Sequence, residues 1–110
     1  MATVRKILGQ QAPAATTDAT LYTVPGATDA VVSSIVIAET GGNPATFQVC
    51  VDSAGGTTTV DSKAIAWDVP LPANGIVTLT LGITLAAAAT IVVQGSTADV
   101  TFTAFGQENS

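Results

Sequence analysis

The sequence contains no histidine and only three basic residues among its 110. Histidine is the commonest general base, the usual partner of a nucleophilic Ser or Cys, and the commonest metal ligand. Its absence excludes Ser-His-Asp and Cys-His hydrolysis. The eight acidic residues are dispersed, nearly all at expected turns, strand ends or termini, and neither a calcium loop nor a phosphate-binding glycine motif is present. We therefore expect no enzyme activity, no cofactor and no metal site.

Charge is also scarce. Charged residues make up 10% of the chain, against roughly 25% in an average soluble domain. The net charge is −5 and the basic residues are Arg5, Lys6 and Lys63, so the stripe of cations that binds phosphates is missing and no nucleic-acid partner is expected. Hydrophobic residues make up 47%. Such a surface is typical of a protein covered by identical copies or by a partner, which predicts a homo-oligomer.

Long apolar runs and cysteine pairs are missing as well. Thr or Gly interrupts the apolar stretches, and none approaches the roughly 20 residues of a spanning helix. Arg5 and Lys6 are followed by only two apolar residues, which does not match a signal peptide. We expect a soluble protein made in the cytoplasm, with no membrane partner. The lone Cys50 lies in an alternating segment that predicts a buried core position.

What the sequence has instead is alternation with period two, broken by turn-forming residues about every ten positions. Eight strands are expected, at residues 4–8, 19–24, 30–38, 46–51, 63–69, 76–81, 91–96 and 100–105. The alanine-rich segment after the sixth strand is too short for a stable helix and predicts a turn. The fold class is therefore all-β: an antiparallel two-sheet sandwich of about seven to eight strands, either jelly-roll-like or Ig-like.

Three local features follow from this pattern. Turn residues predict one hairpin between residues 30–38 and 46–51, and another between 91–96 and 100–105. Trp67 alternates with Ile65 and Val69, which predicts a core anchor and not a ligand-stacking side chain.

The chain divides at residue 18 into an N-terminal arm and linker (1–18) and a β-sandwich domain (19–110). A stretch rich in Gly, Gln, Ala and Pro follows the first apolar residues and could leave them free of the body. We expect an arm that docks on a neighbouring subunit or another acidic surface by adding a strand to a free sheet edge. The contact residues are Val4, Arg5, Lys6, Ile7 and Leu8. A disordered terminus is the alternative.

Three segments together resemble a family of small structural proteins of tailed-phage virions. Residues 20–25 with 30–35 are similar to its opening, and residues 66–74 are similar to its turn of an aromatic residue, Asp and two prolines. Residues 82–106 resemble its closing strands, so the likeness covers roughly residues 19–108. The chain departs from the family at two turns, Pro25-Gly26-Ala27-Thr28 and Ala88-Ala89.

The resemblance implies a virion structural role, on the capsid surface. The leading hypothesis is a capsid decoration, or cement, protein that binds the assembled head lattice. Its partners would be the major capsid protein and its own copies, with a homotrimer suited to three-fold sites. Members of the family are associated with heads and with tails, so a tail or baseplate accessory module that binds a glycan or receptor stays open.

Overall fold

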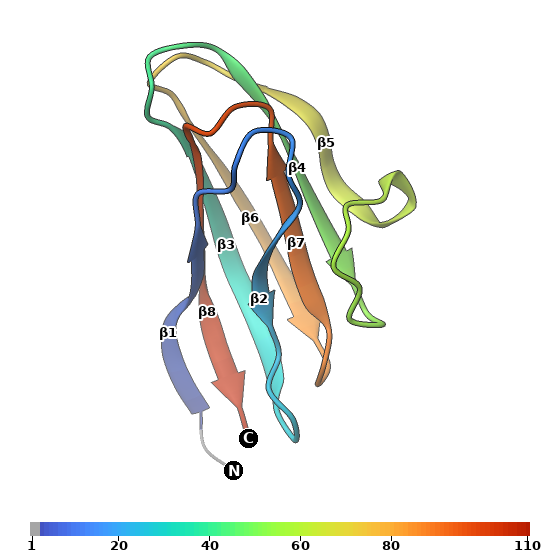
Figure 1. Cartoon of the computed structure of the whole chain (residues 1–110). Helices are drawn as coiled ribbons and strands as arrows, with labels where there is room; N and C mark the ends of the chain where they lie inside the picture. Colours follow the sequence, from blue (N-terminus) through green and yellow to red (C-terminus); the bar gives the residue numbers. More distant parts are fainter. Residues whose placement is uncertain (1–2) are drawn as a thin grey trace.

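The computed structural model describes residues 3–110, and for Leu81 the backbone alone. These residues form eight strands and one short 3-10 turn, η1 (Asp61–Lys63) (Figure 1). The strands are β1 (Thr3–Gln11), β2 (Ala19–Thr23), β3 (Asp29–Glu39), β4 (Ala45–Asp52), β5 (Ala64–Leu71), β6 (Ile76–Leu85), β7 (Thr90–Gly95) and β8 (Val100–Asn109). The all-β prediction is confirmed, because period-two alternation is the pattern of a strand with one buried face. No helix in this part of the chain is long and apolar enough to span a bilayer.

The strands form two four-stranded antiparallel sheets that pack face to face. Sheet A has the order β1-β8-β3-β6 and sheet B the order β2-β7-β4-β5. The first strand therefore pairs with the last, the second with the seventh, the third with the sixth and the fourth with the fifth. This nested pairing is the jelly roll, one of the two sandwiches that the sequence left open.

The core lies between the two sheets and is built from alternate residues of their strands. Phe47 of β4 and Phe102 of β8 meet across the sandwich with ring centroids 6.4 Å apart and planes at 74°, the edge-to-face arrangement that aromatic pairs favour. Ile35 and Ile37 of the central strand β3 are fully buried beside them. Cys50 is buried as predicted, but it does not belong to this core: its thiol donates to the carbonyl of Val60 on the other side of sheet B.

Both predicted hairpins are wrong. β3 and β4 lie in different sheets, and so do β7 and β8. Alternation and turn residues suit an arch between two sheets as well as a hairpin within one. At the β3–β4 arch the buried Glu39 carboxylate accepts hydrogen bonds from the amides of Gly41 (2.8 Å), Gly42 (2.8 Å) and Asn74 (2.9 Å). This carboxylate ties the arch to the β5–β6 turn, and the Asn74 amide is the main cause of its lowered pKa.

The N-terminal segment is part of the sandwich. Residues 3–11 form the edge strand β1, paired with β8 from Thr3 opposite Asn109 to Gln11 opposite Phe102. The following linker is also attached, since the amide of Thr16 donates to the carbonyl of Gly95 at 2.8 Å. The first two residues of the expected arm lie outside the described part. The predicted contact role of this segment stays a prediction.

Candidate functional site

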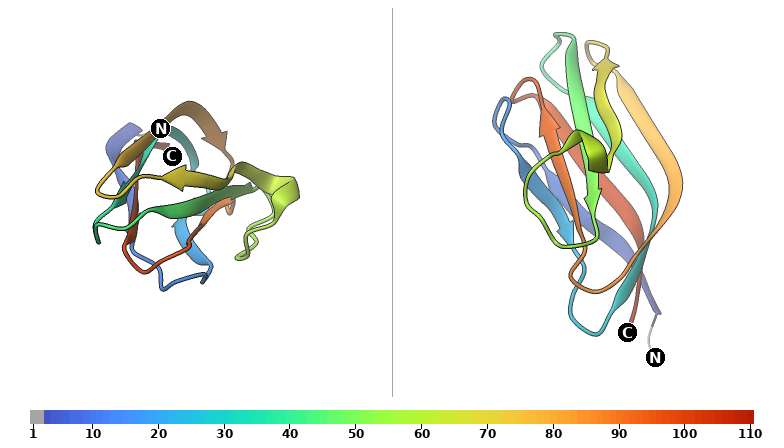
Figure 2. Two further views of the ribbon diagram at one scale, coloured as in Figure 1. Left: turned by 90° about the horizontal axis from the view of Figure 1, so that it is seen from above. Right: turned by 90° about the vertical axis from the view of Figure 1, so that its right-hand side faces the viewer.

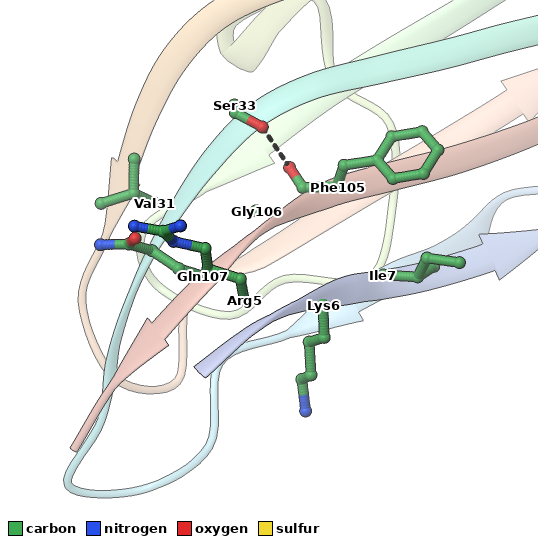
Figure 3. A pocket seen from close by; sticks show the side chains of 8 residues that line it. All are labelled: Arg5, Lys6, Ile7, Val31, Ser33, Phe105, Gly106 and Gln107. Atoms are coloured by element: carbon green, nitrogen blue, oxygen red, sulfur yellow. Dashed lines mark hydrogen bonds between the residues drawn. The ribbon is translucent and has the colours of Figure 1, made fainter. Parts of the chain in front are cut away.

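A groove of about 530 Å³ lies on the outer face of sheet A, where β1, β8 and β3 run side by side (Figure 3). Its walls are mainly apolar and aromatic, with one guanidinium at the rim. The lining residues are Arg5, Lys6, Ile7, Val31, Ser33, Phe105, Gly106 and Gln107. A second hollow of about 380 Å³ contains no cation, so the groove is the candidate site; that hollow is lined by Gln10, Gln11, Ala12, Thr101, Phe102 and Thr103.

Irregularities in the strands hollow out the groove. Val32 pairs with Gly106 and Ser34 with Phe105, so Ser33 is an extra residue that forms a β-bulge in β3. The hydroxyl of Ser33 donates to the carbonyl of Phe105 at 3.1 Å and holds the bulge against β8 (Figure 3). Gly106 is required here, because a Cβ would lie 2.1 Å from the carbonyl oxygen of Val31.

The two neighbouring cations of β1 point in opposite directions. Arg5 lies beside Gln107 and Val31 at the groove, whereas the side chain of Lys6 points away from it (Figure 3). The Lys6 ammonium lies 2.9 Å from Oε1 of Glu108. Arg5 takes part in neither of the ion pairs found among residues 3–110, which are Lys6–Glu108 and Lys63–Asp52. The groove therefore offers one cation that no carboxylate among the described residues neutralises.

Glu108 joins the two sheets beneath the groove. Its carboxylate accepts a hydrogen bond from the hydroxyl of Tyr22 in β2 as well as the Lys6 contact. The Tyr22 hydrogen bond, followed by that of Lys6, lowers the pKa of Glu108. Burial and the nearby carboxylate raise the pKa of Tyr22 well above its usual value. Lys6 thus anchors β1 to the body of the protein.

The five predicted contact residues separate in the structure. Arg5 and Ile7 line the groove with their side chains, whereas Lys6 borders it and directs its ammonium away toward Glu108 (Figure 3); the Ile7 side chain is 52% exposed. Val4 is half exposed and does not line it, while Leu8 packs against the core. Sequence reasoning missed the walls from β3 and β8, because only the strand register reveals that Ile7 lies opposite Phe105 and Arg5 opposite Gln107.

Part of the outer face of sheet B, over β7, is covered by the chain itself (Figure 2). The segment 53–63 crosses in front of β7 in the right-hand view of Figure 2. It is held by the Lys63–Asp52 ion pair at 2.8 Å and by the hydroxyl of Thr90, which donates to the carbonyl of Gly56 at 2.6 Å. Cys50 is buried beneath it, and burial raises the pKa of its thiol. A buried, protonated thiol is a packing residue and not a nucleophile.

Trp67 is not the core anchor that the alternation predicted. Its side chain is 41% exposed, like that of Ile65 at 40%. Phe47 pairs with Val69 and Val49 with Ala66, so β5 contains one residue more than β4 and bulges at Asp68, which has φ 50°. The extra residue reverses the alternation, and Val69 packs against the core while Trp67 lies outside.

Residues 3–110 contain no cluster of three or more potential metal ligands.

Comparison with known proteins identifies the fold but no family. No family model and no curated protein matches the sequence. Two solved structures of infectious bursal disease virus match in three dimensions. The Gx strain gives a TM-score of 0.58 at 12% identity over 97% of this chain, and the T13 viral particle gives 0.56 at 14% over 97%.

The likeness shows that this chain shares its β fold with a part of each of these two viral chains. This chain spans about a third of the matched chains, with coverage of 32% and 29% of their lengths. A pentameric capsid protein isolated from metagenomic phage sequences gives a TM-score of 0.39 at 17% identity, over 98% of this chain and 60% of that chain.

Proposed function

We propose that this protein is a structural component of a virus particle, and specifically a capsid decoration protein of a tailed phage. The observation that carries the proposal is the match of 97% of the chain to chains from two structures of infectious bursal disease virus, one of them a viral particle. Jelly rolls recur in viral capsid and lectin domains. The resemblance of residues 19–108 to small phage virion proteins supports the more specific part of the proposal, a phage particle and a position on the surface of its head.

In this role the protein binds the assembled lattice of the major capsid protein and not its free subunits. A ligand that binds only the assembled state stabilises that state by mass action. Many copies, each with a modest interface, together oppose rupture of the shell. Copies of the chain also contact one another, and a trimer is the stoichiometry that three-fold sites of a shell favour.

The sheet A groove is the proposed contact with the capsid or with a neighbouring subunit. Ile7 and Phe105 supply apolar surface there, and the unneutralised Arg5 supplies a site for a carboxylate of the partner. β1 also has an unpaired outer edge to which an extended segment of the partner can add a strand.

The test is binding to particles assembled without the chain. The variant Arg5→Glu/Ile7→Asp reverses the charge and removes the apolar contact of two exposed side chains. We expect its occupancy on particles to fall at least tenfold at a fixed concentration. Thr58→Glu, on the exposed segment over sheet B, is the control and keeps parental occupancy. Failure of the parental protein to bind any particle would overturn the role, and full binding by the double variant would overturn the groove as the contact.

The second candidate is a tail or baseplate accessory module that binds a glycan or receptor. The exposed Trp67 favours it, since aromatic faces stack on sugars and jelly rolls include lectin domains. Trp67 is the single tryptophan of the chain, so its fluorescence reports directly on a ligand. Two results would favour this module over the decoration protein. Host-surface glycans would shift the Trp67 emission saturably, and calorimetry would show that Trp67→Phe no longer binds them.

A further inference from the structure

The sandwich has four edge strands, β1 and β6 in sheet A and β2 and β5 in sheet B. Soluble proteins protect such edges with charge, proline, bulges or short length. β1 carries Arg5 and Lys6, β2 has five residues, and β5 contains Pro70 and the bulge at Asp68. Each of these three edges therefore carries a feature that disfavours pairing with the same edge of a second copy.

β6 is the fourth edge and is long, apolar and uncharged. Its ten residues, Ile76–Leu85, include no charged residue and no proline. The register shifts between Thr80 and Ile83, with Gly82 at φ 60°, so residues 76–80 form an uninterrupted stretch ahead of this bulge. Ile76 is 67% exposed, the highest value among the large hydrophobic side chains that the structure describes. This stretch has the features of a strand that another strand covers.

Side chains that face the core from β6 are covered only in part. Val77 and Leu79 pack against the core but are half-buried, whereas Ile35 and Ile37, opposite them on β3, are fully buried. The difference arises because β6 has a neighbour on one side alone. A strand added to the free edge would bury the exposed flank of these residues and pair the free main-chain groups.

We propose that β6 pairs with β6 of a second copy, antiparallel across a two-fold axis, and extends sheet A to eight strands. The distribution of charge over the edge strands favours pairing of β6 with β6 of a second copy. Pairing β1 with β1 would bring Arg5 and Lys6 of two copies together, and like charges across a pair are destabilising. Pairing β6 with itself opposes no charges, and the two-fold operation makes the same surface complementary on both copies.

The uninterrupted stretch sets the register. Centring the pair on Thr78 uses all five residues from Ile76 to Thr80 and places Thr78 opposite Thr78 of the other copy. Val77 then lies opposite Leu79 of the other copy on the core side. Thr78 itself is exposed on the outer face, where Thr–Thr pairs across strands are favourable. By itself this contact forms dimers, and with a three-fold contact elsewhere it links trimers in pairs.

The test reverses charges at the two-fold position. Thr78→Lys and Thr78→Asp each place like charges opposite each other, and we expect either variant alone to raise the dissociation constant of the pair at least tenfold by analytical ultracentrifugation. An equimolar mixture places Lys opposite Asp and should restore association. Thr84→Lys is the matched control: Thr84 is exposed on the same strand beyond the bulge, and we expect it to associate like the parent.

Circular dichroism of each variant establishes that loss of association is not loss of fold. The proposal is overturned if the parent is monomeric at tens of micromolar. It is also overturned if Thr78→Lys associates like the parent, or if the mixture does not recover. These outcomes do not depend on binding to particles, so the contact and the virion role fail separately.

Discussion

At the scale of single residues, the aromatic side chains divide between the core and the surface. Phe102 is fully buried against Phe47, whereas Trp67 is 41% exposed. We expect Phe102→Ala to lower the free energy of unfolding by about 3–5 kcal/mol, the range for a buried aromatic. Trp67→Ala should lower it by about 1 kcal/mol or less, since exposed positions contribute little. Urea titrations measure both values, and equal losses would contradict the surface position of Trp67.

Three carboxyl groups make the fold sensitive to acid. The pKa values of Glu39, Asp52 and Glu108 are lowered, chiefly by the Asn74 amide, the Lys63 ammonium and the Tyr22 hydroxyl respectively. A carboxyl with a lowered pKa stabilises the fold above its unfolded value, here 4.5 for Glu and 3.8 for Asp, and that stabilisation is lost as pH falls through the folded pKa.

We therefore expect the melting temperature to be steady near neutral pH and to fall below about pH 4.5. Glu108→Gln removes one titrating group and should melt lower than the parent at pH 7 but lose less on acidification. Tyr22 has the opposite sign: its raised pKa gives stability that is present below pH 10 and lost above it. Thermal melts across the pH range measure the loss of melting temperature in acid and in alkali. If Glu108→Gln lost as much melting temperature in acid as the parent, the contribution of Glu108 would be contradicted.

At the scale of strands, alternation identified where the elements lie but not which face each one presents. All eight strands form close to their expected positions. Alternation fails at bulges. Strict alternation would put Val31 on the same face as Ile35, but Ser33 shifts β3 so that Val32 is the buried residue, and Asp68 shifts β5 in the same way. A bulge adds one residue without any fixed sequence signal, and one residue is enough to exchange the two faces.

The sequence also did not reveal which strands pair, and therefore it did not reveal the groove. Arg5 and Ile7 could be named as contact residues because cations and apolar residues are rare together in this chain. Their neighbours Phe105 and Gln107 come from the opposite end of the sequence, and no local pattern joins residues about 100 positions apart. A turn of five residues between β3 and β4 leaves both a hairpin and an arch possible, and burial across two sheets decides between them.

At the scale of the whole molecule, the nested pairing constrains the order of folding. β4 and β5 are the one pair of consecutive strands joined within a sheet, and every other ladder encloses them. The outermost ladder joins Thr3 to Asn109. Closing long loops costs entropy before any contact repays it, so folds dominated by distant pairings fold in milliseconds to seconds.

We therefore expect refolding on that timescale, with β4 ordered before β1. Val49 is fully buried in β4, whereas Leu8 is a half-buried residue of the edge strand β1. Val49→Ala should slow refolding, because contacts formed in the transition state change the folding rate, and Leu8→Ala should mainly speed unfolding. Stopped-flow measurements across urea concentrations separate the two rates. If Leu8→Ala instead slowed refolding as much as Val49→Ala, the β1–β8 ladder would belong to the nucleus, and folding would begin by joining the ends of the chain.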